Sequence, residues 1–266
     1  MNNQFLRISL YVGILLYQSC SFNHFFYNTK NETCPIDKNP KFEELLLTNA
    51  SGDILNGLLL NPNDNNVKGN ILLIHGNSDD ISRWIENAKP LFDHNYRVLI
   101  FDYEGYGKSM GKPTHKNVVT DTELFLNYLN QRFGKVILWG ISLGGNLSVN
   151  IAYRNSDKVK GLIIEGGFTS HNEIARKLAP GAVRPFILMT VRSPYKSKEI
   201  IKKLHIPVLV AHSPADQVVP YRMGRTLFEN ANEPKFFLEL SGKHCDGIRN
   251  NTREYLELID KINSVR

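Results

Sequence analysis

The stretch that most constrains this chain is residues 140–144, Gly-Ile-Ser-Leu-Gly, which lies between a strand-like run and a helix-like run. Residues 135–139 form a short apolar run with β-branched members, which is typical of a buried strand. Residues 146–153 carry apolar side chains at helical spacing. Glycine, serine and glycine at alternate positions in this context predict a sharp turn that presents Ser142 as a nucleophile.

The residue types in this turn have separate chemical reasons. A serine on so sharp a turn is held in a strained backbone conformation, and small neighbours let the strand and the helix approach each other. The backbone N–H of Leu143, at the start of the helix, can face an oxyanion that develops on a bound carbonyl. Because the bare pattern occurs by chance in about one chain in ten, its partners further along the chain decide its meaning.

Length and charge exclude some classes of function. The chain has 266 residues, of which 42% are hydrophobic, so it can bury a substantial core, and one α/β domain can reach this size. The formal net charge is +6, but Lys and Arg are scattered along the sequence without a long basic block. This distribution indicates a solvated surface rather than a nucleic-acid groove, and we expect no nucleic-acid partner.

The N-terminus has the features of an export signal. Residues 1–7 are short and positive, and residues 8–17 form an apolar run that is too short to span a bilayer comfortably. Cys20 resembles the lipidated cysteine of a bacterial lipobox, although Leu16 stands four residues before it rather than three. We predict that residues 1–20 are a signal peptide and that the protein is exported to the cell envelope. Lipidation of Cys20, an uncleaved anchor and a structural start to the domain are open alternatives.

The next segment and the cysteines are less informative. Residues 21–40 are rich in Asn and aromatic residues and show no period, so we interpret them as a tether or an irregular strap. If Cys20 is lipidated, Cys34 and Cys245 are left as a pair that could form a disulfide, and two unrelated thiols explain them equally well. The sequence has no C-x-x-C motif and no His/Cys cluster at metal-ligand spacing, so we expect neither a metal nor a cofactor.

From residue 41 onward, strand-like and helix-like segments alternate. Two strand-like runs at 42–48 and 54–60 are joined by a polar segment with Gly52, which predicts a hairpin. Further apolar runs predict buried strands at 70–74, 96–102, 135–139, 159–165, 206–211 and 236–240.

Helices are predicted between these strands. One is expected at 82–92, kinked or shortened by Pro90, and another from Asn117, as its capping residue, to Phe133. The alternation predicts an α/β fold with a mostly parallel sheet and helices on both faces, after an N-terminal antiparallel hairpin. In such a fold, the loops at the carboxyl ends of the strands carry the functional site.

Two residues in the last third of the chain complete a catalytic set with Ser142. Asp216 follows the strand predicted at 206–211, and His244 follows the strand predicted at 236–240. This chain order is the order of the α/β-hydrolase triad. We predict that His244 takes the Ser142 proton during attack and returns it to the leaving group, while Asp216 orients and stabilises the imidazole.

These motifs together resemble the α/β-hydrolase superfamily of serine hydrolases over residues 41–262, within a predicted catalytic domain at 41–266. The similarity is greatest to the single-domain group of esterases, lysophospholipases and protein depalmitoylases that includes membrane-associated members. The matching segments are residues 74–77, residues 101–109, the serine turn with Gly145, residues 162–168, the Asp216 loop and His244. One departure is Ser213, where the family commonly has glycine. The resemblance implies that the backbone N–H of Asn77 is a second oxyanion donor beside that of Leu143.

Other carboxylates compete for the role of the acid. Glu165 ends a predicted strand and is the main rival of Asp216. Asp246 is a weaker rival, because side chains so close on one loop as Asp246 and His244 rarely orient each other well.

The remaining titratable residues have simpler interpretations. His75 fits a loop-ordering role better than the role of a base, and Asp102 fits a structural role in its glycine-rich loop. His171 and His212 are expected to be loop or surface histidines.

An insertion at about 168–200 lies where the family carries its lid. It combines apolar segments with six basic residues, Arg176, Lys177, Arg184, Arg192, Lys196 and Lys198. A short apolar cap with basic flanks would suit an acyl chain and a membrane surface, and simple packing over the edge of the sheet is an equally good interpretation.

The sequence therefore predicts a hydrolase of carboxylic esters or thioesters that acts on a small-molecule or lipid-like substrate. Ser142 excludes the hydrolases that use a carboxylate nucleophile, and peptidase activity is disfavoured because no large domain covers the site. The alternative is a catalytically degenerate envelope protein that keeps the fold as a binding module. The complete set of serine, aspartate and histidine favours the enzyme.

Overall fold

The computed structural model describes residues 26–29, 39, 41–62, 66–179, 181, 184, 191 and 193–265. The predicted signal peptide, with Cys20, lies outside these ranges, as do Cys34 and most of the predicted tether. Inside them, no helix has both the length and the apolar character that crossing a membrane requires.

Within the described residues, eight strands form one sheet in the order β1-β2-β4-β3-β5-β6-β7-β8. The β1–β2 and β2–β4 pairs are antiparallel, and the other neighbours are parallel. The strands are β1 (Phe42–Thr48), β2 (Ile54–Leu60), β3 (Gly69–Ile74), β4 (Tyr96–Phe101), β5 (Val136–Ile141), β6 (Val159–Glu165), β7 (Val208–His212) and β8 (Lys235–Glu239). The predicted α/β fold with an N-terminal antiparallel hairpin is confirmed.

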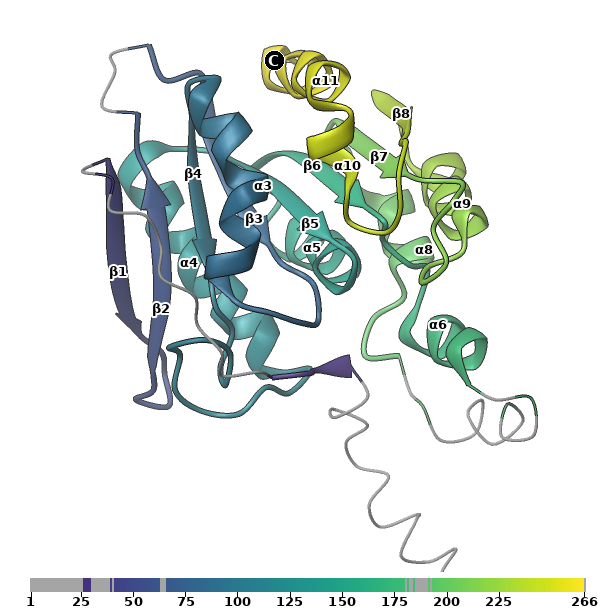
Figure 1. Cartoon of the computed structure of the whole chain (residues 1–266), viewed down its shortest axis with the longest axis horizontal. Helices are drawn as coiled ribbons and strands as arrows, with labels where there is room; N and C mark the ends of the chain where they lie inside the picture. The colour runs from purple at the N-terminus through teal and green to yellow at the C-terminus, as the bar shows by residue number, and fades with distance from the viewer. Residues whose placement is uncertain are drawn as a thin grey trace, which may run out of the picture.

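Helices cover both faces of this sheet (Figure 1). The face with α4, α5 and α9 holds one apolar cluster, and the face with α3 and α11 holds the other. The helical segments are α3 (Ile81–Asp93), α4 (Asn117–Phe133), α5 (Leu143–Arg154), α6 (His171–Leu178), α8 (Ser197–Ile200), the 3₁₀ turn η3 (Ile201–Lys203), α9 (Tyr221–Asn230), α10 (Gly247–Asn250) and α11 (Thr252–Ser264).

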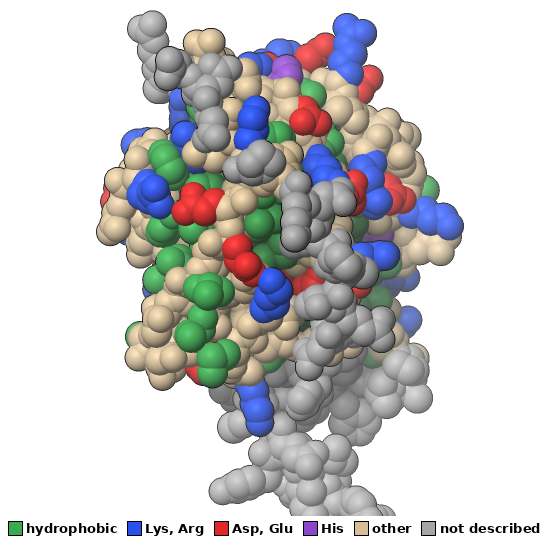
Figure 2. Space-filling model, turned by 60° about the vertical axis from the view of Figure 1, so that its left-hand side comes forward, with side chains coloured by type: hydrophobic (Ala, Val, Ile, Leu, Met, Phe, Trp, Pro, Cys, Tyr) green, Lys and Arg blue, Asp and Glu red, His purple; other side chains and the backbone are tan. Residues whose placement is uncertain are grey.

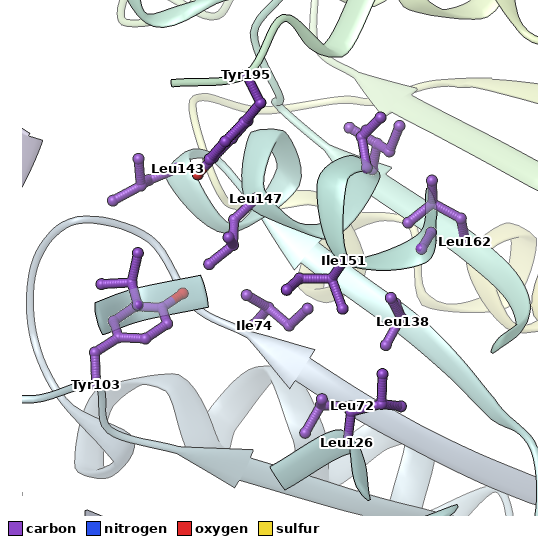
Figure 3. Packing of buried hydrophobic residues seen from close by; sticks show 14 of the residues in the cluster. Leu72, Ile74, Tyr103, Leu126, Leu138, Leu143, Leu147, Ile151, Leu162 and Tyr195 are labelled. Carbon is purple, nitrogen blue, oxygen red and sulfur yellow. The ribbon is translucent and has the colours of Figure 1, made fainter. Parts of the chain in front are cut away.

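The apolar strands explain why both faces need cover. Successive side chains of a strand point to opposite faces, so Leu72 and Ile74 of β3 enter one cluster while Leu73 enters the other. Figure 3 shows Leu72 and Ile74 on the side where Leu147 and Ile151 of α5 pack. Complete burial of each such side chain contributes about 1.5–3 kcal/mol.

Two predicted helix ends differ in detail. Pro90 does not shorten α3, which begins after the capping side chain of Asp80 and continues to Asp93. Asn117 is the first residue of α4 rather than its cap, since Lys116 occupies the cap position. The backbone N–H of Asn117 donates to the hydroxyl of Thr114 at 3.0 Å.

One face of the molecule carries interspersed charges rather than one basic field (Figure 2). On the face shown in Figure 2, Lys and Arg side chains lie among Asp and Glu side chains. One exposed ion pair of the described structure joins Lys108 to Glu44 at 2.5 Å. Pairs of this exposed kind contribute little to stability, about 0–1 kcal/mol.

The parallel strands bring the functional loops to one edge. β3 ends at Ile74, β5 at Ile141, β6 at Glu165 and β7 at His212. Because neighbouring parallel strands end at the same edge of the sheet, the residues that follow them lie close together although they are far apart in sequence.

Candidate active site

Ser142 lies on a strained turn between β5 and α5. Its backbone has φ 57° and ψ −114°, a conformation that an L residue adopts only when its surroundings impose it. The flanking glycines permit the turn. A Cβ on Gly140 would lie 2.2 Å from the carbonyl oxygen of Gly144, and a Cβ on Gly144 would lie 1.9 Å from the carbonyl oxygen of Ile74. Strand and helix can therefore approach this closely only with glycine at both positions.

Three side chains from distant parts of the chain form a hydrogen-bonded series. Nε2 of His244 lies 2.9 Å from Oγ of Ser142, and Nδ1 of His244 lies 2.6 Å from Oδ2 of Asp216. Because the carboxylate accepts, Nδ1 carries the proton and Nε2 is left as an acceptor for the serine hydroxyl. This is the geometry in which an imidazole can take a proton from a nucleophile.

Asp216 is held as a carboxylate by its surroundings. Burial alone would raise its pKa, but hydrogen bonds from His212 and His244 outweigh burial and hold the pKa well below its usual value. The backbone N–H groups of Val218 and Val219 donate to its other oxygen at 2.8 Å. The side chain is only 2% exposed, so water does not compete for these partners.

His212 corrects the expectation of a loop or surface histidine. It is the last residue of β7 and is fully buried. Its Nε2–H donates to the carbonyl oxygen of Val219 at 3.0 Å and lies 3.4 Å from Oδ2 of Asp216. The strand continues into this residue, so its side chain points into the core beneath the Asp216 loop. Ser213, at the departure from the family pattern, donates to the carbonyl oxygen of Gly242 at 2.5 Å and so ties this loop to the His244 loop.

The rival carboxylates are engaged elsewhere. Glu165 is buried and accepts from the backbone N–H of Gly247 at 3.0 Å and from the hydroxyl of Tyr255 at 2.8 Å. Burial raises its pKa. Asp246 pairs with Arg249 at 3.1 Å. In the part of the chain that the structure describes, neither carboxylate hydrogen-bonds to the imidazole of His244.

The loop after β3 lies next to the serine. A Cβ on Gly76 would lie 3.6 Å from Cβ of Ser142, and Asn77 lines the same pocket as Ser142 and His244. His75 is buried, and its Nδ1–H donates to the carbonyl oxygen of Gly76 at 2.8 Å. Burial lowers the pKa of His75 to about 4, so it is neutral. Its bond fixes the peptide unit that carries the Asn77 N–H.

Three side-chain donors hold other carbonyl groups of this loop. The hydroxyl of Tyr103 donates to the carbonyl oxygen of His75 at 2.8 Å, and that of Tyr106 donates to the carbonyl oxygen of Asn77 at 2.9 Å. The indole N–H of Trp84 donates to the carbonyl oxygen of Ser78 at 2.9 Å. Every carbonyl from residue 75 to residue 78 therefore has a side-chain donor. The tyrosines lie in the glycine-rich segment, but their spacing alone did not reveal this role.

Asp102 connects that glycine-rich segment to α3. Its side chain accepts from the backbone N–H of Ile81 at 2.9 Å, and the hydroxyl of Ser109 donates to its carbonyl oxygen at 2.7 Å. Burial raises its pKa to about 8. Asp102 therefore holds the loop in place, and no described hydrogen bond joins it to Ser142 or His244.

Residues near the N-terminus also reach the site, a position that the interpretation of residues 21–40 as a tether or strap did not specify. The backbone N–H of Asn28 donates to the carbonyl oxygen of Asn77 at 3.0 Å. Phe26 and Tyr27 are buried beside it, and the Tyr27 hydroxyl hydrogen-bonds to Nδ1 of His115 at 2.9 Å. The short purple segment in Figure 1 is this stretch. It lies against the loops at the carboxyl edge of the sheet.

His171 is a second correction to the expected surface histidines. It is the first residue of α6 and is fully buried. Its ring lies edge-on to Phe26 at 4.8 Å and to Tyr195 at 5.0 Å between centroids. Burial lowers its pKa well below the usual value. The first turn of α6 faces an aromatic cluster, which explains why this helix starts with a buried ring.

A pocket of about 600 Å³ opens beside the serine. Its lining combines the β3 loop, the start of α3 and the His244 loop, and includes Asn77, Arg83, Trp84, Ser142, His244, Cys245 and Arg249. No disulfide joins Cys245 to another described residue, and Cys34 lies outside those residues, so their pairing stays a prediction. Among the described side chains, no group of three His, Cys, Asp or Glu could hold a metal ion.

A family sequence profile matches this chain. The profile of the Hydrolase_4 family, described as "Serine aminopeptidase, S33", matches residues 65–198, which is half of the chain. The chain belongs to this family of α/β hydrolases. Family membership makes hydrolysis its reaction class.

Relatives and solved structures agree with this assignment. The chain is similar to the uncharacterized protein YfhR of Salmonella typhi, with 26% identity over 91% of this chain and 87% of YfhR. It is also similar to lysophosphatidylserine lipase ABHD12 of Danio rerio, with 30% identity over 62% of this chain and 48% of that protein. The Pyrococcus furiosus esterase Pf2001 has a TM-score of 0.69 at 16% identity, covering 88% of this chain and 98% of the esterase. An α/β hydrolase of Vibrio vulnificus has a TM-score of 0.70 at 19% identity, covering 84% and 82%. At such identities the structural likeness establishes the fold alone.

Proposed function

We propose that this protein hydrolyses carboxylic esters or thioesters through an acyl-enzyme intermediate. The observation that carries the proposal is the hydrogen-bonded series of Ser142, His244 and Asp216, at 2.9 Å and 2.6 Å. In this proposal Ser142 is the nucleophile, His244 the base and Asp216 the acid.

The two chemical steps follow from this series. Oγ of Ser142 attacks the substrate carbonyl carbon while His244 takes the hydroxyl proton, and the imidazolium then gives that proton to the leaving alcohol or thiol. Water repeats the sequence on the acyl enzyme and releases the acid. Asp216 stabilises the imidazolium, and its lowered pKa keeps it ionised throughout.

The oxyanion donors proposed are the backbone N–H groups of Asn77 and Leu143. Leu143 is the first residue of α5, so its N–H has no partner within the helix and lies at the positive end of the helix dipole. The Asn77 N–H belongs to the peptide unit that His75 fixes. Loss of one such donor typically lowers kcat by about 10²–10³-fold.

Lipid-like esters are the substrates that we favour. One relative is named a lysophosphatidylserine lipase and a structural neighbour an esterase, and the pocket beside Ser142 accommodates a sizeable substrate group. The family description also names a serine aminopeptidase, which makes peptide hydrolysis the second candidate. Rates on p-nitrophenyl esters and on aminoacyl p-nitroanilides would separate the two.

Covalent labelling of the full chain with a fluorophosphonate tests the proposal directly. We expect labelling of the wild-type protein, loss of labelling in Ser142→Ala, and turnover of p-nitrophenyl esters whose optimum chain length defines the acyl group. A folded wild-type protein that is neither labelled nor active would instead indicate the degenerate binding module.

We also propose export to the cell envelope. The positive start, the apolar run at 8–17 and Cys20 support it. Cell fractionation, with metabolic palmitate labelling of the wild type and of Cys20→Ser, would test export and lipidation separately.

A further inference from the structure

A second pocket, remote in sequence from the serine turn, is lined by cations. Among the described residues, this cavity of about 390 Å³ is lined by Arg176, Lys177, Arg184 and Arg222, which we call the basic pocket. All four residues are exposed to solvent. The pocket shares no lining residue with the pocket beside Ser142. It is therefore a separate concave site whose described lining residues carry one sign of charge.

None of these cations has an ion-pair partner within the described chain. Their side chains have one described hydrogen bond, which Nε of Arg184 donates to the carbonyl oxygen of Ala179 at 3.2 Å. Glu173 of α6 lies within the field of Arg176, but it pairs with Lys198 at 2.5 Å. Like charges gathered in one hollow repel each other, so an anion supplied from outside would relieve this repulsion.

The position of Arg222 adds to this argument. It stands in the first turn of α9, which has no acidic residue in that turn and no side-chain cap. A helix N-terminus carries partial positive charge, so an arginine there is unfavourable for the isolated helix. The same dipole adds to the positive potential of the basic pocket. Arg176 and Lys177, in contrast, lie in the last turn of α6, where cations are favourable.

The chemistry of the lining selects the anion. Arginine presents a planar fork of donors that matches phosphate oxygens, and several cations around one hollow suit a phosphate better than a single carboxylate. An apolar neighbour indicates a lipid source for that phosphate. Leu178 directly follows Lys177 on α6 and is 48% exposed. Basic side chains beside an exposed apolar one are typical of helices that lie on membrane surfaces.

We propose that the basic pocket binds the headgroup phosphate of anionic lipids and docks the α6 side of the protein on an anionic membrane surface. Figure 1 shows α6 at the rim of the molecule, beyond the sheet. The binding does not depend on the identity of the nucleophile, so it can be tested without an activity assay.

Vesicle flotation of the full chain tests this docking. Vesicles of phosphatidylcholine alone are compared with vesicles that also contain phosphatidylglycerol. Any insertion of the apolar N-terminus is common to all variants, so the difference between the two lipids isolates the electrostatic part. We expect the wild type to prefer the anionic vesicles, and added salt to weaken this preference.

The decisive variant is the triple substitution Arg176→Gln, Lys177→Gln and Arg222→Gln. Its matched control removes three cations from a different pocket, at the amino ends of the strands, by Lys135→Gln, Lys160→Gln and Lys203→Gln. Both variants change the net charge equally. We expect the first to lower partition onto anionic vesicles on the order of a hundredfold and the control to lower it only slightly.

Three outcomes would overturn the proposal. Equal losses in the two variants would assign the binding to overall charge. No preference of the folded wild type for anionic vesicles would remove the docking surface altogether. Calorimetric binding of inorganic phosphate that depends on the basic pocket, without any vesicle preference, would assign the pocket to a soluble phosphate. Urea unfolding of each variant verifies that it is folded.

Discussion

The hydroxyl of Tyr106 offers a sharp test of how the Asn77 loop is held. Tyr106→Phe removes one donor to the carbonyl oxygen of Asn77 and keeps the buried ring. The Asn28 N–H still donates to that oxygen, so the carbonyl is not left unpaired. Since the backbone of Asn77 has only two free dihedrals, this bond and the His75 bond to Gly76 together set the direction of the Asn77 N–H.

The size of the effect follows from these contacts. One neutral hydrogen bond contributes about 1 kcal/mol net, and the retained partner limits the loss to that scale. If all of it appears in the transition state, kcat falls about fivefold. Complete loss of an oxyanion donor, about 10²–10³-fold, is the upper bound. KM should stay unchanged, because the oxyanion forms only after substrate is bound.

Tyr103→Phe is the matched control. It removes a hydroxyl of the same kind from the carbonyl oxygen of His75, in a peptide unit that does not carry the Asn77 N–H. Tyr103→Phe should lose at least as much free energy of unfolding in urea as Tyr106→Phe, because no second described donor reaches the carbonyl oxygen of His75. Only Tyr106→Phe should lower kcat on a p-nitrophenyl ester. Equal kcat values for the two folded variants would refute a positioning role for Tyr106.

Three further predictions follow from the site. Gly166→Ala should lower kcat at least about tenfold. Gly166 has φ 56°, and a Cβ at this position would lie 3.2 Å from Cε1 of His244. Unchanged kinetics would contradict this prediction. Asp216→Asn should lower kcat by about four orders of magnitude. Glu165→Gln should mainly lower the free energy of unfolding, by about 1–3 kcal/mol, because an amide cannot accept with both of its terminal atoms from Gly247 and Tyr255. The reverse pattern would exchange the two carboxylates. Asp102 has its pKa raised to about 8 by burial, so the stability that it contributes at low pH is lost as the pH rises toward 8. The free energy of unfolding of Asp102→Asn, measured in urea, should therefore rise relative to that of the wild type by up to about 1.4 kcal/mol per pH unit between about pH 5 and pH 7. Parallel curves of unfolding free energy against pH for the two proteins would contradict this prediction.

Local sequence patterns determined most of the fold. The alternation of apolar runs and helical periods predicted the parallel sheet, and the hairpin strands and β6 have the predicted bounds. This succeeds because an apolar strand must be covered on both faces, which leaves few arrangements for a chain of alternating strands and helices. The strained turn at Ser142 was also predictable, because its glycines are required by contacts within the strand–turn–helix unit and with the adjacent strand.

Only the tertiary structure decided which side chains meet. Glu165 is the last residue of β6, and Asp216 lies in the loop after β7. The sequence could not show that, of these two carboxylates, it is Asp216 that hydrogen-bonds to His244. Nor could it show that His212 and His171 are buried, that Asn28 reaches Asn77, or that Arg222 joins the cations of α6. The periodicity of apolar residues indicates on which face of its strand or helix a residue lies. Partners that are more than a hundred residues apart are set by strand order and by the packing of loops at one edge of the sheet.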